Sequence, residues 1–148
     1  MHKDVPDLRI GKSITLRKGS DVCLIGTGVM VAAMMQAANL LQAQGIEARV
    51  ESFHTIKPLD TTTLSEVFMK FPLVAVAEEH GRIGGLGGSI AEWLAMQPST
   101  RARLVQFGTA DQFMHEVGSQ EYARKKFGLT AENIASEVFK KLDLARAA

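Results

Sequence analysis

The feature that most constrains the fold is an alternation of β-rich and helix-forming segments along the chain. The β-rich segments are 13–17, 22–25, 47–53, 73–77 and 103–107. Strands joined through helices pair in parallel, because a parallel pair needs a long crossover connection. The first two segments are joined by the short turn 18–21, which predicts an antiparallel hairpin at or near one edge. We therefore predict an α/β fold, a three-layer α/β/α sandwich with a five-stranded mixed, mainly parallel sheet.

Helices are expected between the strands and after the last one. They are predicted over 29–44, from Asp60 to about Phe71, over 89–96, and in three short helices at the end of the chain, the first of them over 112–117 and containing His115. Gly45 suits the position that follows a helix, and Asp60 suits the N-cap.

Charge and composition exclude several classes of protein. The 148 residues predict a single domain over 1–148, with its core at about 10–142. The 17 basic and 16 acidic residues give a net charge of +1, which provides no field to attract nucleic acid or a membrane. The start of the chain has no signal-peptide pattern, and Gly, Gln and Asn interrupt the longest uncharged stretch, 22–46. The single cysteine, Cys23, has no partner for an internal disulfide, so we expect a cytoplasmic protein.

Gly26-Thr27-Gly28 stands where a strand turns into a helix, a position whose amide groups can bind an anion. A dinucleotide site would need a third glycine where Val31 stands, although Glu51 lies where a ribose-binding acid would be. We favour the alternative, a tight turn with close packing of helix on strand.

The segment 78–89 concentrates polar and glycine residues after a buried strand and before a helix. Its candidate residues are Glu78, Glu79, His80, Arg82, Gly84, Gly85, Gly87 and Gly88. The carboxyl end of a parallel strand is where α/β sheets place ligands. Acid–base catalysis, a phosphate site on 87–89 and an interface are all possible here, and a mobile polar loop is the plain alternative. A P-loop is excluded because no lysine follows at the required spacing.

Other polar residues form a second group of candidates. They are His54, Lys57, Asp60 and Asp111. His54 begins a loop at another strand end and could join the first group. No set of His, Cys, Asp and Glu has metal-ligand spacing, and no Ser-His-Asp set can be assigned from sequence order, so no catalytic, cofactor or metal residue is predicted.

Segment 29–44 carries no charge, whereas a surface helix of a small protein needs a broad polar face. One side of this helix packs on the sheet. The other side is covered either by a partner chain or domain, which we favour, or by the C-terminal helices. Met34 and Met35 are expected to point outward.

Four segments together resemble the C-terminal domain of the transketolase family. They are 12–45, in particular 11–28 with Gly19-Ser20-Asp21 and Gly26-Thr27-Gly28; 53–60, similar to the family's "TIKPLD" signature; 77–87, similar to its "EEH…GGLG" loop; and 107–134, similar to its closing "G-x-x-D-x-F…G-L-T-x-E-x-I" pattern. The resemblance covers about 10–142. It departs from the family at Thr109-Ala110, where Ile-Pro often precedes the aspartate.

This resemblance implies a role in a thiamine-diphosphate- and magnesium-dependent enzyme. In that family the cofactor binds between two other domains, whose motifs this sequence lacks. The chain is therefore expected to be a fragment or a split subunit, to bind neither cofactor nor metal alone, and to be inactive by itself. Its partners would be the domains or subunits that carry the thiamine site, in a homo- or hetero-oligomer, with the loop 78–89 serving that contact.

The resemblance favours transfer of a two-carbon ketol unit between sugar phosphates as the reaction of the complete enzyme. A 2-oxoacid decarboxylating component is the second possibility. A stand-alone regulatory module with a small-anion site on the glycine-rich loop is the alternative from another class.

Overall fold

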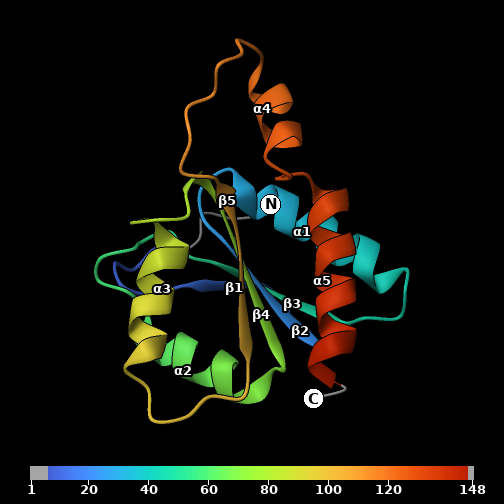
Figure 1. The fold of residues 1–148 in the computed structure, drawn as a ribbon. Helices are drawn as coiled ribbons and strands as arrows, with labels where there is room; N and C mark the ends of the chain where they lie inside the picture. The colour runs from blue at the N-terminus through green and yellow to red at the C-terminus, as the bar shows by residue number, and fades with distance from the viewer. Residues whose placement is uncertain (1–6, 147–148) are drawn as a thin grey trace.

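Strands and helices alternate along the part of the chain that the computed structural model describes, residues 7–146, with side chains through Asp143. The elements are β1 (Ile14–Arg17), β2 (Val22–Gly26), α1 (Met30–Gln42), β3 (Ala48–Ser52), α2 (Thr61–Lys70), β4 (Leu73–Gly81), α3 (Leu86–Ala95), β5 (Arg103–Thr109), α4 (Gln120–Lys126) and α5 (Ala131–Arg146). The sheet lies between α2 and α3 on one side and α1 and α5 on the other (Figure 1). This confirms the predicted three-layer, five-stranded α/β/α fold.

The strand order is β1-β3-β2-β4-β5, with β1 antiparallel to β3 and all other neighbours parallel. The antiparallel edge strand is confirmed, but the predicted hairpin of β1 with β2 is wrong, because β3 lies between them. Gly19 permits this arrangement: a Cβ there would lie 2.2 Å from the carbonyl carbon of Ala48. The amide groups of Ser20 and Asp21 both donate to the carbonyl oxygen of Glu47, at 3.0 and 2.9 Å. The turn thus passes tightly across the start of β3 and delivers the chain to β2.

Each face of the sheet has its own apolar core, because successive side chains of a strand point to opposite faces. In β2, Leu24 packs toward α1 and α5, whereas Cys23 and Ile25 pack toward α2 and α3. Burial raises the pKa of the Cys23 thiol, so this cysteine is an inert core residue rather than a nucleophile.

The second face of α1 is covered within the chain itself. Met34 is fully buried, in the same core as Ile134, Val138 and Leu142 of α5. The expectation that Met34 points outward to a partner is therefore wrong, and Met35 is half-buried. The alternative, cover by the C-terminal helices, is correct, so α1 needs no charged face.

Several element boundaries differ from the prediction where tertiary contacts decide them. β4 continues through Glu78 to Gly81, because Gly81 still pairs with Thr109 of β5. The predicted helix 112–117 is wrong: this stretch is irregular and exposed, His115 included. It belongs to the segment 110–119, which projects with α4 from the rest of the molecule (Figure 1). None of the helices in the described part of the chain has the length and apolar character needed to cross a membrane.

Candidate functional site

The parallel strands end at one edge of the sheet, and this brings the separate motifs of the sequence together. A cavity of about 420 Å³ opens there, called the carboxyl-edge cavity below. It is lined by Thr27, Gly28, Val29, Ile56, Glu78, Glu79, His80, Gly84 and Gly85. The glycine turn after β2, the loop after β3 and the segment after β4 thus share one site, as α/β topology favours.

Glu78 is buried and caps the start of helix α3. Its two carboxylate oxygens accept hydrogen bonds from the amide groups of Leu86 and Gly87, both at 2.8 Å. Gly85 makes this possible, since a Cβ there would lie 1.9 Å from Oε2 of Glu78. A carboxylate at a helix start is favourable for the helix dipole. The amide groups at which a phosphate could have been held are therefore bound to the chain's own carboxylate.

Glu79 points to the other face of β4 and holds α4 in place. Its carboxylate accepts from Nε of Arg124 at 2.6 Å and from Nε2 of Gln120 at 2.8 Å. His80 is exposed, with Nδ1 3.1 Å from the carbonyl oxygen of Gly81. Glu78, Glu79 and His80 are the predicted polar residues that line the cavity. Both glutamates are bound to other elements, whereas the His80 side chain contacts no other element among the described residues.

Arg82 does not line this cavity, although the sequence groups it with the others. Its amide donates to the carbonyl oxygen of Thr109, and its exposed side chain crosses β5 at Gly108. Gly84 has a φ of +78°, which favours glycine at this turn. At Gly88 a Cβ would lie 3.2 Å from the carbonyl oxygen of Arg82, so this glycine permits close packing of α3 on the loop.

His54 and Lys57 belong to the loop after β3. Nε2 of His54 lies 3.1 Å from the carbonyl oxygen of Arg9 and therefore carries the ring proton toward it. Nδ1 of the same ring is buried and has no partner among the described residues. Lys57 is exposed, and the structure gives it no role at the cavity.

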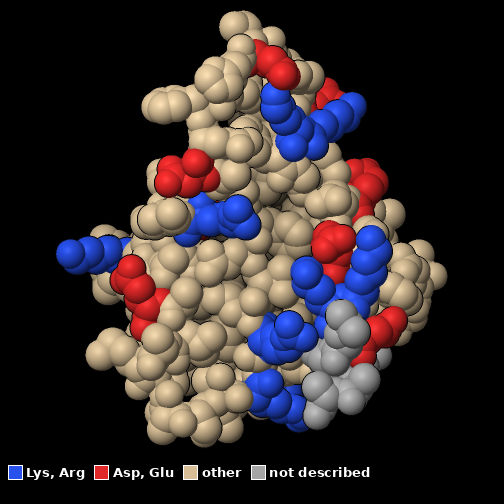
Figure 2. Space-filling view, in the orientation of Figure 1, with Lys and Arg blue, Asp and Glu red and all other residues tan. Residues whose placement is uncertain are grey.

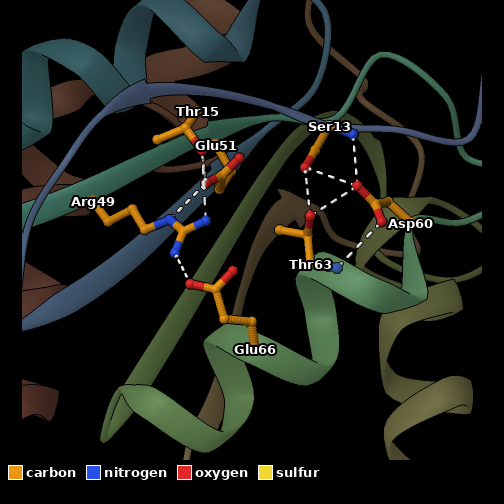
Figure 3. Close-up of polar contacts among 7 residues, drawn as sticks. All are labelled: Ser13, Thr15, Arg49, Glu51, Asp60, Thr63 and Glu66. Atoms are coloured by element: carbon orange, nitrogen blue, oxygen red, sulfur yellow. Dashed lines mark hydrogen bonds and ion pairs between the residues drawn. The ribbon is translucent and has the colours of Figure 1, made fainter. Parts of the chain in front are cut away.

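Asp60 is a structural residue at the start of α2, which confirms the predicted cap (Figure 3). Its carboxylate accepts from the amide and hydroxyl of Ser13, at 2.8 and 3.1 Å, and from the hydroxyl and amide of Thr63, at 2.8 and 3.2 Å. Burial alone would raise the pKa of Asp60, but these hydrogen bonds outweigh it and hold the pKa below its ordinary value. Asp60 thus fastens the start of the β1 segment to α2.

A second polar cluster under β1 was not predicted. Oε1 of Glu51 accepts from Nε of Arg49 and from the hydroxyl of Thr15, both at 2.6 Å, and Arg49 also binds Glu66 (Figure 3). Burial alone would lower the pKa of Arg49, but the bonds to Glu66 and Glu51 raise it. The Arg49 bond lowers the pKa of Glu66. Alternation in β3, which places Arg49 and Glu51 on one face, is the signal that could have revealed this pair.

These contacts also distinguish between the two interpretations of Gly26-Thr27-Gly28, a dinucleotide site and a tight turn. Glu51 is buried in its ion pair, so it does not face a ribose beside Gly26-Thr27-Gly28. A Cβ at Gly26 would lie 2.9 Å from Cα of Val31, which confirms close packing of helix on strand.

The carboxyl-edge cavity does not fit a diphosphate–magnesium group. Carboxylates contribute to its wall, and the amide groups at the start of α3 are already bound to Glu78. Among the described residues no group of three or more His, Cys, Asp or Glu side chains could hold a metal ion.

Comparison with known proteins gives a family match over residues 11–134, to the model described as transketolase, C-terminal domain. A 6-deoxy-6-sulfo-D-fructose transketolase subunit, SqwH, from Clostridium sp. (strain MSTE9) is 42% identical over 128 residues, 86% of this chain and 39% of the relative. A 1-deoxy-D-xylulose-5-phosphate synthase from Heliobacterium modesticaldum (strain ATCC 51547 / Ice1) is 33% identical over 91% of this chain and 21% of its own length. The chain thus spans between one fifth and two fifths of these relatives.

Among solved structures, one described as "Split gene transketolase, inactive beta4 tetramer" matches with a TM-score of 0.85 and 35% identity, covering 98% of this chain and 47% of that one. A transketolase from Pichia stipitis matches with a TM-score of 0.69 at 22% identity, over 93% of this chain and 19% of that one, and this likeness concerns the fold alone.

Proposed function

We propose, from the premise that this chain belongs to the transketolase C-terminal domain family, that it is the C-terminal part of a thiamine-diphosphate-dependent transketolase-type enzyme. The reaction proposed for the complete enzyme is transfer of a two-carbon ketol unit between sugar phosphates. The similarity to a transketolase subunit and to a split-gene transketolase supports this reaction. The similar synthases make synthesis of a deoxyketose phosphate the second candidate.

The role proposed for this chain is assembly rather than chemistry. It spans less than half of its relatives, so the cofactor and magnesium would be held by domains or subunits outside it, in a homo- or hetero-oligomer. Glu78, bound to α3, and Glu79, bound to α4, are already committed to the fold and are poor candidates for proton transfer. A cytoplasmic location belongs to this proposal, and the single buried cysteine supports it.

The observation that carries the proposal is the apolar surface around the carboxyl-edge cavity. Val29 and Ile56 line that cavity yet are 52% and 39% exposed. Ile10 is 80% exposed, and its neighbours Arg9 and Gly11 are both bonded to the loop after β3. Exposed apolar side chains gathered from three separate segments indicate a docking surface, with His80 supplying a polar contact.

The experiment mixes the full chain with the cofactor-bearing chain from the same genome and measures both association and turnover. Val29→Asp should lower the affinity by about tenfold or more, because the docked carboxylate loses its water. Position 29 is the N-cap of α1, where aspartate favours the helix, so the variant should still fold.

Met96→Asp is the matched control, since Met96 is 84% exposed at the other end of α3, and it should assemble like the wild type. His80→Ala should keep turnover within about tenfold. Unchanged assembly of Val29→Asp would remove the docking surface from the proposal. A loss of turnover of about a thousandfold in His80→Ala, with assembly intact, would show that His80 takes part in proton transfer.

A further inference from the structure

A second concave region lies beside the carboxyl end of β5. Two adjoining cavities, of about 760 and 350 Å³, share Arg82, Gln106, Ala110 and Gln112 in their walls and are called the β5 cleft below. None of the residues that line the carboxyl-edge cavity lines the β5 cleft. The cleft therefore has its own chemistry, separate from the docking surface proposed above.

The motif Gly108-x-x-Asp111-x-Phe113, which the docking role leaves unexplained, falls within this cleft. A Cβ at Gly108 would lie 2.9 Å from Cγ of Arg82 and 2.9 Å from the carbonyl oxygen of His80. The missing side chain at position 108 therefore leaves room for Arg82 to cross β5. Arg82 thereby lines both cavities.

Four polar side chains of the β5 cleft have no partner among the described residues, whereas Lys126 pairs with Glu116 and Asn133 donates to the carbonyl oxygen of Gly128. In the part of the chain that the structure describes, no hydrogen bond or ion pair is formed by the side chains of Arg82, Gln106, Asp111 or Gln112. Charged side chains gather over α4 and α5, and basic and acidic side chains also lie near one another beside the carboxyl end of β5 (Figure 2). Arg82 forms no ion pair among the described residues, although Asp111 lines the larger cavity with it.

The two cavities differ in chemistry. The larger one combines Asp111, Gln106 and Thr109, which can bind hydroxyl groups, with the apolar side chains of Leu104 and Phe113. The smaller one contains the cations of Arg82 and Lys126 and no carboxylate in its wall, although Lys126 also pairs with Glu116 at 2.7 Å. The planar, forked guanidinium suits a tetrahedral oxyanion.

We propose that the β5 cleft binds a small phosphorylated sugar or similar polyol, with the phosphate on Arg82 and the hydroxyl groups on Asp111 and Gln106. The site goes beyond the assembly role, because it is formed by residues of this chain alone. Its test needs no partner, so failure of the docking experiment leaves this one intact, and the reverse also holds.

The experiment titrates the full chain with ribose 5-phosphate, inorganic phosphate and ribose, followed by calorimetry. Ribose 5-phosphate should bind more tightly than phosphate, and phosphate more tightly than ribose. Arg82→Gln should weaken binding of both phosphate compounds by about tenfold or more, since a charge-assisted contact is lost. Asp111→Asn should reduce the advantage of ribose 5-phosphate over phosphate.

Arg103→Gln is the matched control, because Arg103 is exposed at the opposite end of the same strand. It should leave all three affinities unchanged. Equal effects of the two arginine variants, or equal affinities for ribose 5-phosphate and phosphate in the wild type, would overturn the proposal. Absence of saturable binding up to millimolar ribose 5-phosphate would overturn it as well.

Discussion

The two edges of the sheet treat polar side chains in opposite ways. Beside β1, charged and hydroxyl groups are buried and bind one another, as in the pairs of Arg49 with Glu51 and of Asp60 with Ser13 (Figure 3). Beside β5, Arg82 and Asp111 face a cleft and bind no described side chain. The difference shows that polar residues at a sheet edge support the fold where their partners lie inside the chain. Where those partners are lacking, the same residue types are available to a ligand.

The largest effect on stability is expected from Arg49→Met. Glu51 is 1% exposed, so this change leaves a buried carboxylate without its cation. The free energy of unfolding should fall by about 3–5 kcal/mol, as measured by urea denaturation. Glu66→Gln is the control: Glu66 is 54% exposed, and the loss there should stay below about 1 kcal/mol. Equal losses would show that the β1 cluster is no more than a surface ion pair.

A smaller loss, of about 2–3 kcal/mol, is expected for Asp60→Ala. This variant removes the cap of α2 and leaves the amide of Ser13 without its acceptor. Asp111→Ala, at the other edge, should change the free energy of unfolding by less than about 0.5 kcal/mol. If thermal and urea unfolding gave similar losses for both aspartates, the contrast between the two edges would not hold.

The smallest effect is expected for the pH dependence of the free energy of unfolding that Asp60, at the β1 edge, provides. The pKa of Asp60 is below its ordinary value of 3.8 in the folded chain, so the unfolded chain binds a proton first as the pH falls. The carboxylate therefore contributes stability above about pH 4 and loses it as the pH falls through the folded pKa. Between pH 5 and pH 3 the wild type should lose more stability than Asp60→Asn in urea titrations. Parallel losses would mean that Asp60 is not held in its charged form by these bonds.

The sequence was sufficient for the layers and the edge strand, because periodicity and turn residues are local signals. It failed for the hairpin, since nothing in residues 18–21 reveals that β3 will lie between β1 and β2. It failed again for 112–117, where no neighbouring element is present to bury a helix. The burial of the second face of α1 could not be predicted from the sequence around it, because that face is covered by α5, which lies far along the chain.

At the candidate site the sequence gathered the right segments but could not separate neighbouring residues. Glu78 and Glu79 are the same residue type, yet alternation along β4 sends one to α3 and the other to α4. Arg82 was grouped with the carboxyl-edge residues, and only the pairing of β4 with β5 shows that it belongs to a different cavity. The residues that bind the cofactor-bearing chain remain a prediction.

The passage of residues 18–21 across β3 also determines the order in which this protein can be completed during synthesis. β1 leaves the ribosome before any of its partners exist: Ile14 pairs with Ser52, and the amide of Ser13 binds Asp60, 47 residues later. Through all of that interval the nascent strand has no sheet to join. The edge is closed only after β2, α1, β3 and the start of α2 have emerged. Closing it is a long-range step, of the kind that makes folding slow and leaves a strand edge open to other chains in the meantime.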